Sequence, residues 1–159
     1  MSRTWPVVLL LLAGCGVEPS AVTDRSEAPT GVAAGPTLYF VDGEGVLRPQ
    51  LRRTGRLGTI FDALGLLLTG AGGSALHTEI APSAVTRVVV TTTPEVIQLA
   101  VPLTDRDVTP LGIDQIVCTA LGVHVQSGGA RTMKAQVRFV QPSPESDVVR
   151  TCPLISPGS

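Results

Sequence analysis

The sequence predicts an α+β domain, a small and mainly antiparallel sheet with two amphipathic helices packed on one face. Three observations lead to this class. Short runs rich in β-branched and aromatic residues are separated by turn residues, as in hairpins. Two longer runs repeat apolar residues at intervals of three and four, as in helices with one buried face. The runs follow in the order β-β-α-β-β-α-β, and one sheet face can bury both apolar helix faces.

The first two predicted strands form a hairpin. Residues 37–41 (TLYFV) stop at Asp42-Gly43, which is a tight-turn signal. Residues 46–53 then alternate imperfectly between apolar and polar side chains. Pro49 lacks a backbone N–H, which indicates an edge strand or an extended segment.

The first predicted helix begins at Thr59. The Thr59 hydroxyl can cap the helix, and Asp62 can reach back to complete a capping box. Gly70 is predicted to end the helix because glycine adopts the left-handed conformation easily. The predicted buried face consists of Ile60, Phe61, Leu64, Leu67 and Leu68.

Residues 87–93 and 96–102 are predicted to form a second hairpin around a proline-containing turn. Thr109-Pro110 then opens the second helix with a capping hydroxyl and a proline at the first helical position. Gly122 is predicted to end this helix. Its predicted buried face consists of Ile113, Ile116, Val117, Ala120 and Leu121.

Residues 134–141 alternate apolar and polar side chains, which predicts a half-buried final strand. The folded domain is therefore expected to span 37–141. Residues 142–159 form a proline-rich C-terminal tail, which we expect to lie along the surface, held by Cys152.

The N-terminus carries an apolar run that is too short to cross a membrane. A spanning helix needs about 20 apolar residues, whereas residues 5–13 have the length of a signal-peptide core. Leu12-Ala13-Gly14-Cys15 resembles the lipobox of bacterial lipoproteins, in which the cysteine receives a diacylglyceryl group. This resemblance predicts a lipoprotein signal peptide at 1–14 and a lipidated Cys15. An ordinary cleaved signal with an incidental cysteine is the alternative.

Residues 15–36 are expected to be the acylated cysteine and a flexible tether, because 20–36 are poor in large apolar side chains. A random coil over 16–36 has a reach of about 25 Å. Two acyl chains hold a protein durably on a bilayer. The domain is therefore expected on the extracytoplasmic face of the cell membrane, anchored through Cys15.

Cys118 and Cys152 remain once Cys15 is acylated. Two such cysteines in an exported protein indicate a disulfide, and two buried free thiols are the alternative. The sequence has no C-x-x-C motif and no metal-ligand spacing. It therefore predicts neither a metal site nor a cofactor.

The charge and the aromatic content weigh against two classes of partner. The formal net charge is −1, and acidic and basic side chains balance from residue 37 onward. Such a domain lacks the positive field that draws nucleic acid, so no nucleic-acid partner is predicted. Aromatic residues make up 3% of the chain, too few for the stacking platforms of carbohydrate or single-strand readers.

Four arginines between positions 48 and 56 form the predicted interaction patch. Arginine binds phosphate and carboxylate groups bidentately, so the patch could contact anionic headgroups, wall polymers or an acidic partner. The alternative is a solvated edge that protects a strand from mispairing. The members of this arginine patch are Arg48, Arg52, Arg53 and Arg56.

No catalytic residue is predicted. His77 and His124 lie far apart in the sequence without a serine motif, so we expect surface or packing roles. Asp105 and Asp107 are expected to belong to a solvated loop rather than a cation site. The glycines at 70–73 follow a predicted helix, whereas a phosphate loop precedes one.

Four stretches in order resemble the GerMN domain, a module of spore formation and germination that also occurs in actinobacterial surface lipoproteins. LYFVDGEGVLRPQLRR (38–53) is similar to its opening strand, turn and arginine-bearing segment, and ALGLLLTGAGG (63–73) to its leucine-rich helix and glycine turn. DQIVCTALGV (114–123) resembles its second-helix motif, in which a glutamine, aliphatic residues and a threonine recur. MKAQVRFV (133–140) falls at its last strand. Gly70-Ala71 departs from the usual glycine-proline pair, and paired cysteines are not a general family feature.

The resemblance implies an α+β fold akin to ring-building motifs of secretion assemblies, and an interaction role rather than catalysis. We therefore expect a lipid-anchored, non-enzymatic module that binds an envelope protein, or a second copy of itself, through edge strands. A small-ligand or cell-wall-binding accessory lipoprotein is the alternative, and a hydrolase has the least support.

Overall fold

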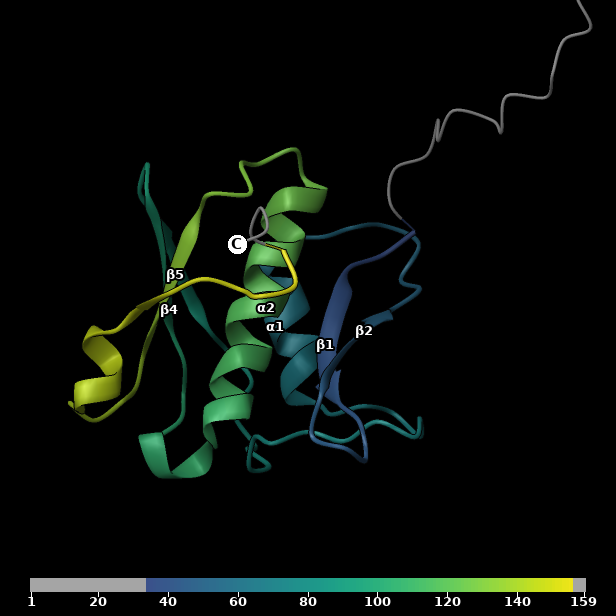
Figure 1. Ribbon diagram of the computed structural model, residues 1–159, viewed down its shortest axis with the longest axis horizontal. Coiled ribbons are helices and arrows are strands. Elements are labelled where there is room, and N and C mark those ends of the chain that lie inside the picture. The colour runs from purple at the N-terminus through teal and green to yellow at the C-terminus, as the bar shows by residue number, and fades with distance from the viewer. Residues whose placement is uncertain (1–33, 156–159) are drawn as a thin grey trace, which may run out of the picture. The chain divides into compact units, whose positions relative to one another are not determined.

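The computed structural model describes residues 34–155, which form an α+β domain of two helices and two sheets (Figure 1). The α+β class and the predicted order of strands and helices are confirmed. The elements are β1 (Thr37–Val41), β2 (Leu47–Leu51), α1 (Ile60–Leu68), β3 (Val89–Thr92), β4 (Val96–Ala100), η1 (Asp105–Asp107), α2 (Pro110–Gln126), β5 (Lys134–Arg138), η2 (Pro144–Asp147) and β6 (Val149–Arg150).

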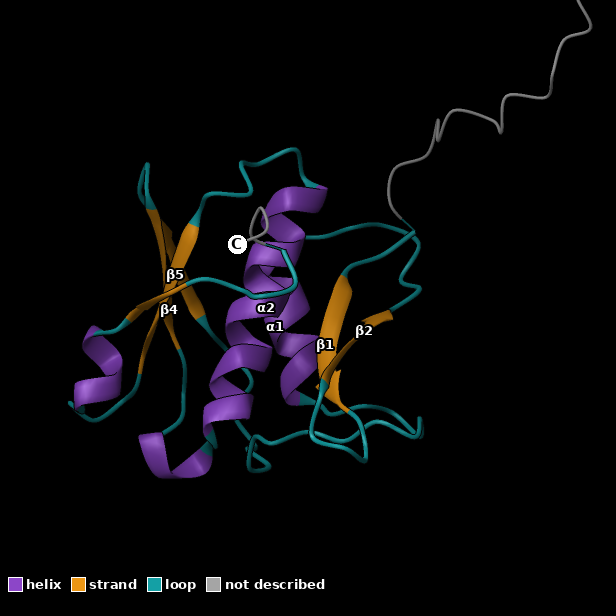
Figure 2. Cartoon of the chain, viewed as in Figure 1, coloured by secondary structure: helices purple, strands orange, loops and turns teal. Residues whose placement is uncertain are grey.

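The strands form two sheets rather than the single sheet expected, and the helices lie between them (Figure 2). β1 and β2 pair antiparallel. The second sheet has the order β3-β4-β5-β6, in which β4 and β5 run parallel. A parallel pair needs a long crossover, which η1 and α2 supply here. The helices are therefore covered on two sides, with α2 against both β1 and β5.

β1 is buried on both faces, and α2 closes the edge that does not pair with β2. The hydroxyl of Thr119 accepts the Tyr39 N–H at 3.1 Å, and the Gln115 amide donates to the Tyr39 carbonyl at 3.0 Å. Further along this strand, Val41 exchanges two backbone hydrogen bonds with His77. Gln115 and Thr119 are both 0% exposed. These buried polar side chains replace the neighbouring strand that β1 lacks on this edge.

α1 begins as predicted. Thr59 and Asp62 form a capping box, with the Thr59 N–H donating to Asp62 Oδ2 at 2.9 Å. Gly70 follows the helix with a φ of +95°, which glycine adopts without strain. One predicted core residue is misplaced, because the Phe61 side chain is 44% exposed. The buried residues of α1 are Ala63, Leu64 and Leu67.

α2 begins as predicted, with the Thr109 hydroxyl accepting the Gly112 N–H at 3.2 Å. The predicted end at Gly122 is wrong, since the helix continues to Gln126. Gly122 is buried, and a Cβ there would lie 3.2 Å from Cε2 of Tyr39. This glycine permits the close approach of β1 instead of ending the helix.

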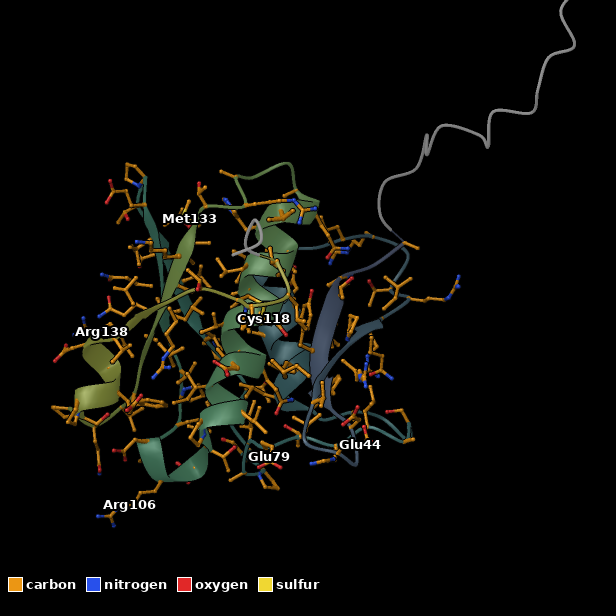
Figure 3. The ribbon with its side chains drawn as sticks, viewed as in Figure 1. Glu44, Glu79, Arg106, Cys118, Met133 and Arg138 are labelled. Carbon is orange, nitrogen blue, oxygen red and sulfur yellow. A yellow bond between two sulfur atoms is a disulfide. The ribbon has the colours of Figure 1, made fainter. Side chains whose placement is uncertain are left out.

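The segment after Gln141 contributes to the domain beyond the expected surface course. It forms η2 and β6, and β6 pairs antiparallel with β5. The expected disulfide between Cys118 and Cys152 is present (Figure 3), and both cysteines are 0% exposed. The bond fastens the C-terminal segment to α2.

Candidate functional site

The arginine patch expected from the sequence does not act as one surface. Arg48 forms an ion pair with Asp42, with 2.6 Å between Arg48 Nε and Asp42 Oδ2. Asp42 also accepts the backbone N–H groups of Glu44 and Val46. The hydrogen bond from Arg48 is the largest of the effects that lower the pKa of Asp42. Arg48 thus stabilises the turn between β1 and β2.

Arg52 has a structural role as well. Its Nη2 donates to the Gly70 carbonyl at 2.9 Å, so its positive charge lies at the C-terminal end of α1, where the helix dipole favours a cation. Its backbone N–H donates to the Pro36 carbonyl at 2.9 Å. Arg52 therefore joins the end of β2, the loop after α1 and the first described residues.

Arg53 and Arg56 remain as exposed members of the patch. Within residues 34–155, neither has a carboxylate within 4.0 Å of its guanidinium nitrogens. Arg56 lines an open groove of about 500 Å³ that sequence reasoning did not predict.

The groove is lined by one face of α1, by residues 54 and 56–58, by Thr86–Arg87 and by Pro36. Phe61 and Leu66 of α1 form an apolar wall, joined by Leu57. Gly65 lines the groove without a side chain. The nearest heavy atom to a Cβ at this position would be the Thr86 carbonyl oxygen, at 4.0 Å.

The groove carries more positive than negative charge. Arg56 and Arg87 face it together with one carboxylate, that of Asp62. Asp62 already accepts hydrogen bonds from the backbone and the hydroxyl of Thr59, which lower the pKa of its carboxyl group, and Arg56 lowers it further. The Asp62 carboxylate is thus occupied by the helix cap. The Arg56 and Arg87 guanidinium groups line the groove beside its apolar wall, where they could bind an anionic ligand that also has an apolar part.

Sequence reasoning missed Arg87 and Phe61 as members of this site. Arg87 precedes β3 and is far from Arg56 along the chain, so no local motif joins them. Only the packing of α1 against β3 brings the two cations to one groove. Phe61 falls on the predicted apolar stripe, but it is exposed at the groove instead of buried in the core.

A second accessible surface is the edge of the four-stranded sheet formed by β3. Within the described part of the chain, β3 pairs with β4 alone. Val89 is 61% exposed, and Thr91 and Thr92 are also exposed. This edge therefore presents backbone hydrogen-bonding groups beside an exposed apolar side chain.

The two histidines have separate environments. His77 Nε2 lies 3.0 Å from Glu79 Oε1, and Glu79 in turn accepts the Thr109 hydroxyl at 3.1 Å. These contacts hold the segment before β3 against the start of α2. His124 lies on α2, with its ring against Gly129.

Asp107 and the glycines at 70–73, which also stand out in the sequence, contribute to local structure. Asp107 caps η1 by accepting the Thr104 N–H and hydroxyl, both at 2.7 Å. The glycines at 70, 72 and 73 all have positive φ in the turn after α1. Among residues 34–155, no three His, Cys, Asp or Glu side chains cluster as metal ligands would.

The predicted signal peptide at 1–14, Cys15 and most of the tether lie outside the described residues. Over 34–155, no helix has the length and apolar composition needed to cross a bilayer. Comparisons of the chain with protein family models, with curated proteins and with solved structures gave no match.

Proposed function

We propose that the protein is a lipid-anchored interaction module on the extracytoplasmic face of the cell membrane, GerMN-like, which binds a protein of the cell envelope without catalysing a reaction. The lipobox-like sequence ending at Cys15 supports the anchor. The Cys118–Cys152 disulfide supports an exported protein, because disulfides persist in oxidising compartments. The resemblance of 38–53 and 114–123 to the GerMN domain supports an interaction role.

The observation that carries the proposal is the open edge of β3. Natural sheets protect their edges with proline, with charged side chains or with very short strands. β2 carries Arg48 and Pro49, and β6 has only two residues. β3 has the sequence VVTT, with neither charge nor proline. It is therefore the least protected of these strand edges and suits the addition of an extended segment from a partner.

Site-specific crosslinking tests this pairing. A photoreactive residue replacing Thr91, which is exposed in β3, should capture an envelope protein in the native membrane, identified by mass spectrometry. The same residue at Glu44, exposed in the β1–β2 turn, is the control. Capture of a second copy from position 91 would show self-association instead. Equal capture from both positions would contradict a role for the β3 edge.

Membrane fractionation tests the anchor separately. Cys15→Ser removes the acylated thiol, so we expect the variant in the medium or soluble fraction, whereas the unchanged protein stays with the membrane. Membrane association of Cys15→Ser that is as resistant to a high-salt wash as that of the unchanged protein would refute the lipid anchor, because salt weakens a contact made through arginines alone.

A small-ligand or wall-binding accessory role is the second candidate, favoured by the groove. Its volume of about 500 Å³ falls in the range of small-molecule sites. A defined wall fragment that binds there should raise the melting temperature by mass action, and Phe61→Ser should abolish the shift. A shift that survives Phe61→Ser would exclude the groove as the site.

A further inference from the structure

We infer that the groove and its neighbouring arginines dock the domain on the anionic phospholipid headgroups of the membrane to which the chain is tethered. The inference rests on the lipid anchor of the proposed function. It adds a second contact with the same membrane, made by the folded domain itself through Arg53, Arg56 and Arg87.

The first described residues lie directly against the segment that carries Arg53 and Arg56 (Figure 1). The Gly55 N–H donates to the Ala34 carbonyl at 2.9 Å, and the Arg52 N–H donates to the Pro36 carbonyl at 2.9 Å. Pro36 also lines the groove. A Cβ at Gly35 would collide with the Arg52 carbonyl oxygen, so glycine is needed for this close approach.

This attachment places the arginines at the membrane-proximal end of an anchored chain. A random coil as long as residues 16–36 has a reach of about 25 Å, and Pro36, at the end of that stretch, lines the groove. Anionic headgroups are therefore held at high local concentration around the groove.

The side chains present suit an anionic headgroup. Arg53, Arg56 and Arg87 are exposed, and no described carboxylate lies within ion-pair distance of their guanidinium groups. Guanidinium groups bind phosphate oxygens bidentately. The exposed Phe61 gives the same surface an apolar side chain for the boundary between headgroup and acyl chain.

Two acidic side chains, Glu44 and Glu79, lie at a different end of the domain (Figure 3). Glu44 and Glu79 lie together at the lower edge of Figure 3, away from the upper right, where the described chain begins. Asp62 is the one carboxylate among the groove residues, and its oxygens accept hydrogen bonds from Thr59. The arginine-bearing end can therefore face an anionic surface while the acidic turn points away.

Vesicle binding of the unacylated chain tests the contact without the anchor. The full chain carrying Cys15→Ser, collected after export, is mixed with vesicles of phosphatidylglycerol and phosphatidylcholine, and with phosphatidylcholine alone. We expect binding to the anionic vesicles only, and weaker binding as salt is added. Equal binding to both vesicle types would overturn the inference.

A matched pair of triple variants locates the contact. Each arginine near an anionic surface changes the partition coefficient about fivefold, so Arg53→Gln with Arg56→Gln and Arg87→Gln should lower it about 100-fold. The control removes three exposed cations elsewhere, Arg106, Lys134 and Arg138, also by glutamine. Figure 3 shows Arg106 and Arg138 at the far side of the domain from the point where the described chain begins. Equal losses in the two variants would overturn the assignment to the groove.

The reconstituted, acylated protein gives an independent reading. An environment-sensitive dye on a cysteine replacing Thr69, which lines the groove, should be quenched by lipid-borne quenchers in anionic vesicles, while a dye at Glu44 should not. The triple variant at Arg53, Arg56 and Arg87 gives a further check. If it loses its crosslinks to a protein partner while its vesicle binding stays unchanged, the groove binds an acidic protein and the lipid contact is overturned. The two claims can also fail separately. If Cys15→Ser stays with the membrane as firmly as the unchanged protein and the chain still binds anionic vesicles, the anchor is refuted and the headgroup contact stands.

Discussion

β1 and β3 each have one edge without a neighbouring strand, and the domain treats the two edges in opposite ways. The edge of β1 is sealed by Gln115 and Thr119, which reach from α2 to the backbone of Tyr39. The edge of β3 has no such side chains among the described residues, and Val89 beside it is exposed. Backbone groups of the same kind thus hold the core together in one strand and are left available for a partner in the other.

The largest effect should come from removing the covalent support of α2, the helix that seals β1. Replacing Cys118 and Cys152 with alanine should lower the free energy of unfolding by about 4 kcal/mol, the chain-entropy value for a loop of this length. Urea unfolding measures the loss, and reduction of the unchanged protein should reproduce it. Equal stability of the variant and the oxidised protein would contradict this expectation.

Gln115→Leu removes the side-chain hydrogen bonds that Gln115 makes at the edge of β1. It removes the partner of the buried Tyr39 carbonyl and of the part-buried Glu79 N–H, which Gln115 Oε1 accepts at 2.7 Å. We expect a loss of about 3 kcal/mol in urea unfolding. Gln98→Leu, in the half-buried Gln98–Gln136 contact at 3.4 Å, is the control and should cost well under half as much. Similar losses in both would mean that the edge of β1 needs no seal.

Asp114 gives a smaller, pH-dependent test on the same helix. Burial raises the pKa of its carboxyl group above 3.8, and Arg150 offsets part of this rise. The carboxylate therefore costs stability at pH 7, and the cost vanishes as the pH falls below 3.8, where the group is protonated in both states. Asp114→Asn should unfold at higher urea than the unchanged protein at pH 7 but not below pH 3.8. Asp105→Asn, exposed in η1, controls for the lost charge.

Val89→Lys should have the smallest effect on stability and the clearest effect on binding. A lysine at an exposed strand edge changes the free energy of unfolding by less than about 0.5 kcal/mol, yet it blocks strand pairing. Crosslinking from position 91 should therefore disappear while the urea midpoint stays the same. Retained crosslinking in a stably folded variant would place the partner elsewhere.

The sequence predicted the features that depend on neighbouring residues. Thr59 with Asp62 and Thr109 with Pro110 mark helix starts because capping is a local interaction. The disulfide followed from the count of cysteines. Cys15 and its lipid stay a prediction, since they lie outside the described residues.

The features that depend on long-range packing could not be read in advance. The apolar faces of the two helices could be buried by one sheet or by two, so the spacing of apolar residues in the sequence did not determine the number of sheets. Gly122 looks like a helix stop in the sequence, whereas its contact with Tyr39 depends on how β1 approaches α2. The groove combines Arg56 and Arg87, which are far apart in the sequence. The role of Gln115 at the edge of β1 is visible only in the folded structure, where its amide donates to the Tyr39 carbonyl.

The position of β1 has a mechanical consequence for a tethered protein. The chain enters the domain through this strand, which β2 holds on one edge and α2 on the other. If Cys15 anchors the chain as proposed, tension on the residues before Thr37 would load β1 first, the strand of the smaller sheet that contacts α2. The four-stranded sheet, with its exposed β3, would receive that load through the helices, since α2 packs against both β1 and β5.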